Sequence, residues 1–336
     1  MKTFKYALLC AATVALASRV DARPANTIAC GASITTDTIE LESDLGPCPA
    51  DGLFINSAQT AVSVNLNGHS ITGSGNGAGL RIGTSNGGVT VKGPGHITGF
   101  GSGILVEDDD VLVYGVTLNT NKTGIGIGNA NRVRIVSNTV RGGNKGQIGV
   151  GTGNAGDIFI YQNAITGHSK AGVAIFGESK TTVDSNTIIG SRTGIFAGPP
   201  DLVCFTIRGN NIFHNRANGI DVSPKGIVGR NLTQALATVG SCFLVEDNTV
   251  TGNGGSGIVM EQASTLDQVL IQDNIVRNNE ANGISLIGGQ GSQVIGNVAL
   301  QNHGVDLLWD ASNSPSSCWK QNIFTTNSPS ELPQCP

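Results

Sequence analysis

Asparagine recurs between residues 138 and 322 at intervals of about two dozen residues. A residue that is apolar follows each of these asparagines two positions later, so the repeated unit is Asn-x-apolar. The asparagines are Asn138, Asn163, Asn186, Asn210, Asn248, Asn274, Asn297 and Asn322, with spacings of 25, 23, 24, 38, 26, 23 and 25 residues. A period in the low twenties predicts a solenoid in which successive coils stack on one another.

The residues between two asparagines predict β-structure. Around Asn163, the apolar residues Ile158, Ile160 and Ile165 alternate with others, and the pair Gly172-Val173 follows. Alternation with a period of two predicts two short strands per coil. Coils stacked at about 4.8 Å let each short strand hydrogen-bond with its neighbours. The chain is therefore predicted to be an all-β parallel β-helix, with each repeated asparagine in a turn where it tolerates a left-handed backbone.

The repeat extends toward the N-terminus through Leu118, Ile97 and Ile71, which gives about eleven coils over residues 61–325 and a length of roughly 50 Å. The long interval after Asn210 predicts an inserted loop at about residues 222–239. A second set of asparagines, five residues after members of the first set, predicts a second polar stack: Asn215, Asn253, Asn279 and Asn302. Leucine-rich repeats would need more leucine, and propeller blades need about twice this period.

The first residues predict a secretory signal peptide over residues 1–22. Lys2 and Lys5 precede an apolar run from Ala7 to Ala17, and small residues follow up to Ala22. This order is typical of a cleaved signal, with cleavage after Ala22 or, alternatively, after Ala17. We therefore expect a secreted protein, extracellular or periplasmic. The apolar run is shorter than the ~20 residues that span a bilayer, so no membrane span is expected.

Charge argues against nucleic acid as a partner. Without residues 1–22 the chain keeps 17 basic and 23 acidic side chains, a net charge of about −6. The sequence shows no basic stripe with interleaved aromatic residues. We expect a monomer whose partner is a polysaccharide.

Six cysteines follow the predicted signal peptide and fall into three pairs that are close in sequence. An even number in an exported chain favours disulfides. Local pairing predicts Cys30–Cys48, Cys204–Cys242 and Cys318–Cys335. Because the ends of a solenoid expose core and strand edges, they need caps. We expect these caps at residues 23–60 and 309–336, the second overlapping the last coil.

The N-terminal region carries a resemblance to a known family. Its residues are Cys30-Gly31, Asp44-Leu45, Cys48, Gly52-Leu53 and the run Val-Asn-Leu-Asn-Gly-His-Ser-Ile-Thr-Gly over 64–73. With the Asn-x-Ile/Val coils that follow, this resembles exported right-handed parallel β-helix repeat proteins of the pectin-lyase-like superfamily. The resemblance covers nearly the whole chain after residue 22 and implies a right-handed β-helix.

The same resemblance implies a range of activities. The superfamily includes pectate and alginate lyases, polysaccharide epimerases, glycoside hydrolases, carbohydrate-binding modules and adhesins. The polygalacturonase blocks Asn-Thr-Asp, Asp-Asp, Gly-His-Gly and Arg-Ile-Lys have no match here beyond His69, His96 and an acidic run at 108–110. The alginate epimerase block Asp-Pro-His-Glu is missing as well.

Alignment of the coils places one set of side chains on a common outer face. Two residues before successive asparagines stand Val136, Tyr161, Asp184, Arg208, Glu246, Gln272 and Ile295. Lyase or epimerase chemistry on uronates needs a group that neutralises the sugar carboxylate and a base that removes the neighbouring proton. Tyr161, Asp184, Arg208 and Glu246 are therefore the candidate catalytic residues. The alternative interpretation is a row of ion pairs that keeps a solvent face soluble.

Other acidic residues provide further candidates. Asp221, Glu261 and Asp306 are expected at or beside a second outer column, as substrate-binding residues or as a carboxylate pair for glycoside hydrolysis; surface charge is the alternative. The acidic run Asp108, Asp109 and Asp110 is a candidate metal site, with calcium as the possible cofactor, against the alternative of a solvated turn.

The remaining polar signals are weaker. His168, His214 and His303 follow their asparagines by five, four and six residues, so we expect them in similar turns without a shared column. Asn121 and Asn231 match the glycosylation pattern Asn-x-Ser/Thr.

These observations support one main hypothesis and two alternatives. The main hypothesis is a secreted polysaccharide-recognising β-helix that acts as a lyase or epimerase on an acidic glycan. The alternatives are a noncatalytic carbohydrate-binding or adhesion protein and a glycoside hydrolase.

Overall fold

The computed structural model describes residues 28–35, 38–56, 61–83, 88–177, 180–198, 204–223, 243–261, 269–289 and 291–336. These residues form a right-handed parallel β-helix of about 11 turns, which confirms the predicted fold. They contain strands and turns and no helix, so none of them belongs to a helix long and apolar enough to cross a membrane. The predicted signal peptide at 1–22 lies outside the described residues.

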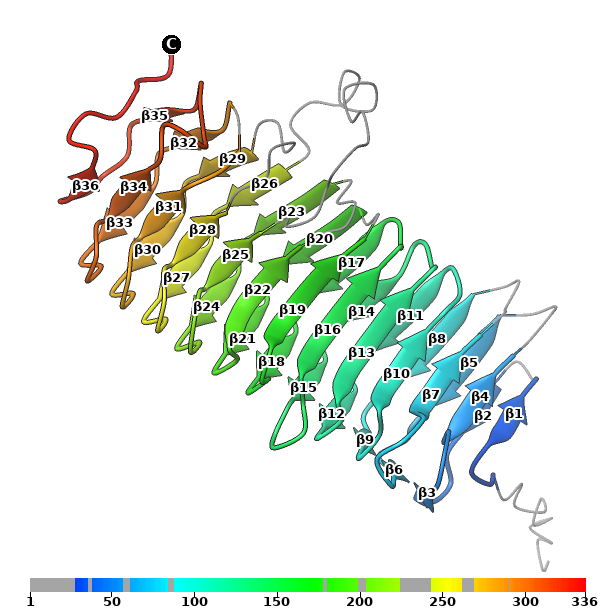
Figure 1. The fold of residues 1–336 in the computed structure, drawn as a ribbon. Coiled ribbons are helices and arrows are strands. Elements are labelled where there is room, and N and C mark those ends of the chain that lie inside the picture. The colour runs from blue at the N-terminus through cyan, green and yellow to red at the C-terminus, as the bar shows by residue number, and fades with distance from the viewer. Residues whose placement is uncertain are drawn as a thin grey trace, which may run out of the picture.

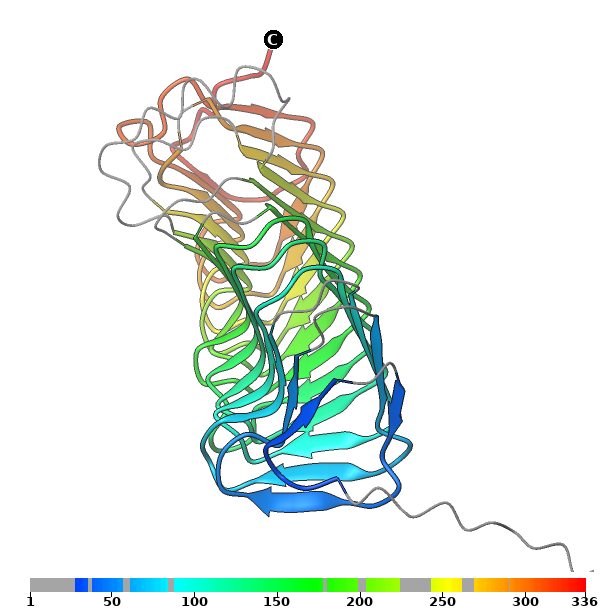
Figure 2. The ribbon, with the colours of Figure 1, turned by 90° about the vertical axis from the view of Figure 1, so that its right-hand side faces the viewer.

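Three parallel sheets, named A, B and C, run the length of the molecule (Figure 1). Within a coil the chain passes from sheet B to sheet C and then to sheet A, before it enters sheet B of the next coil. Figure 2 looks obliquely along the axis, where successive coils overlie one another.

The strands of each sheet are as follows, in spatial order. Sheet A has 13 strands: β1 (Ala32–Ile34), β4 (Leu53–Ile55), β7 (Ala78–Ile82), β10 (Ser102–Val106), β13 (Thr123–Gly128), β16 (Ile148–Gly153), β19 (Ala171–Phe176), β22 (Thr193–Ala197), β25 (Ile220–Val222), β28 (Ile258–Met260), β31 (Ile284–Leu286), β34 (Leu307–Trp309) and β36 (Asn327–Ser328). Sheet B has 12 strands: β2 (Thr38–Glu40), β5 (Val62–Asn65), β8 (Val89–Lys92), β11 (Val111–Tyr114), β14 (Arg134–Val136), β17 (Ile158–Tyr161), β20 (Lys180–Asp184), β23 (Cys204–Arg208), β26 (Phe243–Glu246), β29 (Val269–Gln272), β32 (Gln293–Ile295) and β35 (Cys318–Lys320). Sheet C has 11 strands: β3 (Leu45–Cys48), β6 (Ser70–Gly73), β9 (His96–Thr98), β12 (Thr117–Asn119), β15 (Thr139–Arg141), β18 (Ala164–Thr166), β21 (Thr187–Ile189), β24 (Asn211–Phe213), β27 (Thr249–Thr251), β30 (Ile275–Arg277) and β33 (Val298–Leu300).

The prediction of two strands per coil is wrong, because each coil has three. A sharp corner separates sheet B from sheet C, and the residue before each repeated asparagine makes it. Gln162 and Ser185 have φ angles of 54° and 56°, in the left-handed region, whereas none of the repeated asparagines has a positive φ. The left-handed residue thus precedes the asparagine, contrary to expectation, and the asparagine side chain is free to bond along the axis.

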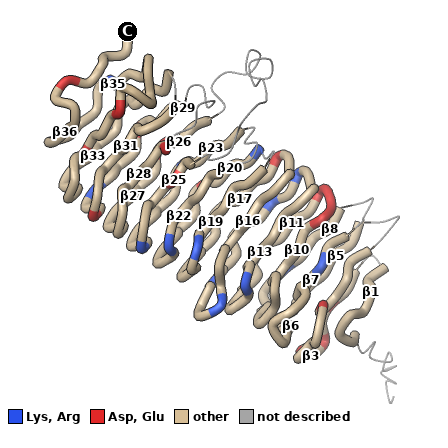
Figure 3. Tube along the Cα trace, viewed as in Figure 1, with Lys and Arg blue, Asp and Glu red and all other residues tan. Residues whose placement is uncertain are grey.

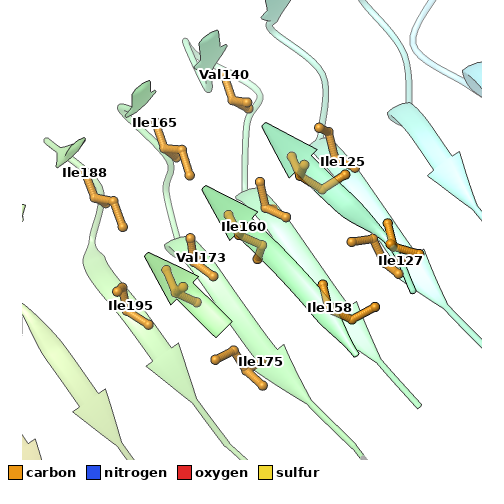
Figure 4. Packing of buried hydrophobic residues seen from close by; sticks show 14 of the residues in the cluster. Ile125, Ile127, Val140, Ile158, Ile160, Ile165, Val173, Ile175, Ile188 and Ile195 are labelled. Carbon is orange, nitrogen blue, oxygen red and sulfur yellow. The ribbon is translucent and has the colours of Figure 1, made fainter. Parts of the chain in front are cut away.

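Aliphatic side chains fill the interior of every coil (Figure 4). Ile160 of sheet B, Ile165 of sheet C and Val173 of sheet A are fully buried. Each stands in register with another aliphatic residue of the next coil, such as Ile188 beyond Ile165. Since burying a side chain of this size contributes about 1.5 to 3 kcal/mol, these columns stabilise the stack.

The repeated asparagines form a continuous ladder at the corner between sheets B and C, as predicted. Asn186 is typical of its members. Its Oδ1 accepts from the backbone N–H of Asn163 at 2.9 Å, and its Nδ2 donates to Asn210 Oδ1 at 3.0 Å and to the carbonyl of Ile160 at 2.8 Å. The same bonds link all eight asparagines from Asn138 to Asn322. The ladder therefore satisfies backbone groups that the corner would leave buried and unpaired.

A second ladder follows the corner between sheets C and A, which confirms the predicted second polar stack. It runs from Ser191 through Asn215, Asn253, Asn279 and Asn302, with backbone N–H to side-chain oxygen distances of 2.9 to 3.2 Å. Asp306 ends it by accepting from the backbone N–H and the Nδ2 of Asn302.

His168 occupies the position before Ser191 in this second ladder. Its side chain is fully buried, and neither ring nitrogen has a hydrogen-bond partner in the described part of the chain. Burial disfavours the charged imidazolium and lowers the pKa of His168 to about 4. The residue is therefore neutral and structural in the folded protein at neutral pH.

Glycines line the same corner because the coils approach closely there. At Gly194, a Cβ atom would lie 2.5 Å from the carbonyl oxygen of Gly219 and 2.5 Å from a methyl group of Ile212. Equivalent glycines stand in ten successive coils: Gly52, Gly79, Gly103, Gly124, Gly149, Gly172, Gly194, Gly219, Gly257 and Gly283. The glycine-valine and glycine-isoleucine pairs of the sequence are explained by this contact.

Disulfides join residues near both ends of the described solenoid. Cys30 pairs with Cys48, and Cys318 pairs with Cys335, as predicted. Cys204 is disulfide-bonded too, and its expected partner Cys242 lies outside the described residues.

The segments expected to form caps already contribute to the solenoid. In the range 23–60, β1 pairs with β4 and β3 pairs with β6. In the range 309–336, β35 pairs with β32. Most of the predicted insertion, residues 224–239, lies outside the described residues.

The first ladder predicts a large loss of stability in Asn186→Ala. This change leaves the N–H of Asn163 and the carbonyl of Ile160 buried without these partners, and we expect the free energy of unfolding to fall by about 2 to 4 kcal/mol. Urea denaturation measures the loss. Asn211→Ala is the matched control, because Asn211 is exposed and faces outward from sheet C. Equal stability of the two variants would contradict the assigned role of the ladder.

His168 predicts a pH dependence of stability. Its folded pKa lies below the unfolded value of about 6.5, so the unfolded chain binds more protons between these values. The stabilising contribution is full above pH ~6.5 and is lost as the pH falls toward about 4, by up to about 3 kcal/mol. We expect His168→Asn to remove this loss in urea denaturation at pH 7 and pH 4.5, while His214→Asn, at an exposed position, retains it. An unchanged pH profile in His168→Asn would show that another group is responsible.

Candidate functional site

The outer face of sheet B carries the column of side chains predicted from the sequence. Val136, Tyr161, Asp184, Arg208, Glu246, Gln272 and Ile295 occupy one register position on successive strands. Adjacent members are therefore about 4.8 Å apart along the axis. The four candidate catalytic residues stand next to one another, as their spacing implied.

The charged members of this column are bonded to each other. Both Nε and Nη2 of Arg208 lie 2.8 Å from Oδ2 of Asp184, whose residue is only 8% exposed. Ser185 Oγ donates to the other oxygen of Asp184 at 2.7 Å. Glu246 accepts from Gln272 Nε2 at 2.9 Å. Asp184 and Arg208 thus form an ion pair in which each neutralises the charge of the other.

Tyr161 differs from its neighbours in the column. Its ring stacks on the ring of Phe159, with centroids 5.4 Å apart and an angle of 17° between the planes. No hydrogen bond joins its hydroxyl to any of the described side chains. Tyr161 is therefore the member of the column that offers both an apolar ring face and an available proton-transfer group.

A groove of about 900 Å³ lies beside this column, over β11, β14, β17 and β20. Its floor consists of Leu112, Arg134, Phe159 and Thr182, which stand in register on the four strands. Arg132, Asp110, Asp157 and Lys180 line it at the corner where sheet A leads into sheet B.

Ion pairs neutralise the acidic groups of this groove. Arg132 bonds Asp110 through Nε at 2.6 Å and Nη2 at 2.7 Å, and Lys180 pairs with Asp157 at 2.9 Å. The hydrogen bond from Arg132 lowers the pKa of Asp110. Arg134, on the floor, forms no ion pair with a described acidic residue. The groove therefore presents one unopposed guanidinium beside the ring of Phe159, an arrangement suited to an anionic sugar, and Tyr161 stacks on that ring without lining the groove itself.

The candidate metal site does not gather its three carboxylates around one point. Asp109 and Asp110 both pair with Arg132, at 3.3 Å and 2.6 Å. Over the described ranges, no group of three His, Cys, Asp or Glu side chains is placed to hold a metal ion. Calcium binding by Asp108, Asp109 and Asp110 stays a prediction.

The three acidic residues expected at a second outer column have separate registers. Asp221 in β25 is in backbone register with Val259, which stands two residues before Glu261. Asp221 and Glu261 both lie at the outer face of sheet A. Asn218 and Ser223 donate hydrogen bonds to Asp221. Their role in substrate binding stays a prediction.

Asp306 is a buried structural residue and is 1% exposed. Burial alone would raise the pKa of Asp306, but hydrogen bonds from Asn302, Thr325 and Thr326 together lower it. The expectation of an outer column was wrong for this residue, because its carboxylate closes the second ladder.

The other polar signals have structural partners or are buried. His303 pairs with Glu280 at 2.8 Å, and His69 lies 3.5 Å from Asp44. Asn121 is 2% exposed and bonds the backbone of Phe100, so it is inaccessible to a glycan in the folded protein. Asn231 lies outside the described residues.

The sequence analysis did not identify the groove residues or the row of basic residues Lys122, Lys145, Lys170, Arg192 and Arg216. The floor residues Arg134 and Phe159 stand four residues before Asn138 and Asn163, a register that the alignment already contained. The basic residues lie in the turns that lead into β13, β16, β19, β22 and β25 (Figure 3). Because these residues are 22 to 25 positions apart in the chain, only stacking of the coils brings them together.

Comparison with known proteins agrees with the fold. The A-module of the mannuronan C-5 epimerase AlgE4 of Azotobacter vinelandii is similar in structure, with 13% identity, a TM-score of 0.50, and coverage of 87% of this chain and 86% of that one. A mutant of the periplasmic alginate epimerase AlgG shows 11% identity, a TM-score of 0.56, and coverage of 88% and 84%. At these identities the likeness concerns the fold alone. No curated protein matches the sequence significantly.

A family model gives the assignment. The model described as "Right handed beta helix region" matches residues 95–234 and 205–327, which together make up more than half of the chain. The three-sheet coils and the two ladders are the structural form of that repeat. This chain belongs to the right-handed β-helix family.

Proposed function

We propose that this chain is an exported protein that recognises an acidic polysaccharide in the groove on sheet B. The observation that carries the proposal is the position of Arg134 beside Phe159 on the groove floor, with Tyr161 stacked on the ring of Phe159. Aromatic rings bind the apolar faces of sugars, and a guanidinium binds a carboxylate through two hydrogen bonds. The groove extends over four strands stacked along the axis, so an extended chain of sugars fits it better than a compact ligand.

Charge within the groove supports an acidic rather than a neutral sugar. Asp110 and Asp157 are neutralised by Arg132 and Lys180, so neither opposes an anionic ligand. The structural likeness to two alginate epimerases supports the same ligand class, although it concerns the fold alone. Disulfides and the predicted signal peptide support export to an extracellular or periplasmic location.

The finer proposal is that the groove supports lyase or epimerase chemistry with Tyr161 as the proton-transfer group. In elimination, Tyr161 removes the proton from the carbon that bears the sugar carboxylate, the glycosidic C–O bond at the neighbouring carbon breaks, a C=C bond forms, and the departing oxygen takes a proton from the tyrosine or from water. In epimerisation, Tyr161 removes that proton from one face and water delivers a proton to the opposite face of the same carbon. Arg134 is the cation on the groove floor that suits the sugar carboxylate, whereas Arg208 is already paired with Asp184.

A noncatalytic binding protein is the second candidate. Asp184 bonds to Arg208, and Glu246 bonds to Gln272. These contacts favour a noncatalytic protein, because both carboxylates already have partners within the column instead of being available to a substrate. Glycoside hydrolysis would rest instead on Asp221 and Glu261, at the outer face of sheet A.

Binding by the groove predicts that Arg134→Ala and Phe159→Ala each weaken the affinity for polygalacturonate or alginate by about tenfold. Calorimetry measures the affinity, with a neutral glucan as the reference ligand. Arg277→Ala is the matched control, because Arg277 is an exposed arginine on sheet C. Full affinity in Arg134→Ala, or equally tight binding of the glucan, would contradict this assignment.

Catalysis predicts an unsaturated product that absorbs in the ultraviolet, or an altered uronate composition of the polymer detected by NMR. Tyr161→Phe removes only the hydroxyl, so we expect it to abolish turnover, with loss of at least about 100-fold, while binding is retained. Circular dichroism checks that the fold is intact. Arg208→Ala is a less informative change, since it leaves the nearly buried Asp184 without its ion pair. Binding without any product would establish the noncatalytic alternative.

A further inference from the structure

A row of basic side chains follows the corner at which the chain passes from sheet C to sheet A. Five consecutive coils each place one cation in the turn that links these sheets: Lys122, Lys145, Lys170, Arg192 and Arg216. All five residues are exposed. We name them the basic edge. Four steps of about 4.8 Å give the row a length of about 19 Å.

Backbone hydrogen bonds hold these turns in register. Gln147 N–H donates to the carbonyl of Lys122 at 2.7 Å, and Lys170 N–H donates to the carbonyl of Gln147 at 2.9 Å. Thr193 N–H donates in turn to the carbonyl of Lys170 at 2.9 Å. Lys122, Lys170 and Arg192 therefore stand at one register position, which Gln147 occupies in the intervening coil, and Lys145 projects from a wider turn two residues earlier.

The basic edge has no acidic partner. The five turns read Thr-Asn-Lys, Gly-Gly-Asn-Lys-Gly-Gln, Gly-His-Ser-Lys, Gly-Ser-Arg and His-Asn-Arg-Ala-Asn-Gly, without Asp or Glu. None of the five cations forms an ion pair with a described acidic residue. Arg216 donates to the carbonyl of His168 at 3.0 Å, which fixes its guanidinium along the row. The row ends at Arg216, because the next turn, Gly-Asn-Gly-Gly-Ser over 252–256, has no charged residue, and the turn after it carries Glu280, which pairs with His303.

Like charges on neighbouring coils repel one another, so this arrangement weakens the fold rather than supporting it. It also runs against the formal net charge of −4 for the whole chain. Binding of a polyanion is the use that offsets such repulsion, because each cation gains a counter-charge that the protein itself does not provide.

We propose that the basic edge is a second binding site, separate from the groove, for a linear polyanionic polysaccharide that lies parallel to the solenoid axis. One cation per coil matches a polymer that carries negative charge at regular intervals. A single-stranded nucleic acid would need aromatic rings on which to stack its bases, and none is exposed in these turns apart from His214 beside Arg216. A membrane surface would favour exposed apolar side chains, and the large ones described, Ile275, Ile323 and Phe324, lie elsewhere.

The test compares two triple variants that change net charge equally. Lys145→Gln, Lys170→Gln and Arg192→Gln neutralise the centre of the basic edge. Lys92→Gln, Arg277→Gln and Lys320→Gln neutralise exposed cations elsewhere and serve as the control. Affinity for polygalacturonate is measured over a range of salt concentrations, with dextran and with vesicles containing phosphatidylglycerol as the other ligands.

We expect the basic-edge variant to bind polygalacturonate about tenfold more weakly at low salt and to lose most of its salt dependence, while the control changes less than about twofold. Equal losses in the two triple variants, or no loss in the first, would overturn the proposal. Tighter basic-edge-dependent binding to the vesicles than to polygalacturonate would replace the polysaccharide by a lipid surface.

The outcome is distinguishable from that for the groove. The basic-edge triple variant is also made in an Arg134→Ala background. If the groove is not a glycan site, Arg134→Ala alone changes nothing and the basic-edge variant still loses affinity. If the basic edge is not a site, the triple variant has the affinity of its Arg134→Ala parent.

Discussion

Side-chain amides carry the hydrogen bonds that a coil of such short strands would otherwise leave unmade at its corners. A chain that turns sharply between two sheets buries backbone groups that no strand can pair. Asn163 and its equivalents accept from a backbone N–H of the preceding coil, donate to a backbone carbonyl of that same coil, and donate to the side-chain amide of the following coil. Because each amide depends on the same residue in the next coil, the ladder fixes the register of all three sheets at once. The outer columns, the groove and the basic edge all derive from that register.

Much of the architecture follows from the sequence because it depends on residues that repeat. The asparagine period determines which residues are neighbours across coils, and this was enough to place Tyr161, Asp184 and Arg208 in one column. Local spacing was also enough for Cys30–Cys48 and Cys318–Cys335. The third sheet was missed because the break in the period of two, between Ile160 and Ile165, was not identified as the corner that the left-handed residue Gln162 makes.

The chemistry of the outer face was harder to predict, since it depends on which side chains satisfy each other. Alignment alone cannot show that Arg208 forms an ion pair with Asp184 while Arg134 forms none with a described acidic residue. Alignment also suggested an outward position for Asp306, although its carboxylate points into a ladder. Net charge was misleading for a related reason. It averages over the whole surface and so hides the cations that gather along one corner of the solenoid (Figure 3).

The second ladder has a direction, and this limits how far it can grow. The Nδ2 group of each asparagine donates to the side chain of the next coil toward the C-terminus. The last asparagine therefore needs a partner that accepts a hydrogen bond and has no donor of its own. A carboxylate has only acceptor oxygens. Asp306 supplies them to Asn302 and to two backbone N–H groups of the terminal segment. An asparagine at that place would leave its own Nδ2 group in need of an acceptor, so the aspartate terminates the second ladder while sheet A continues beyond it to β36.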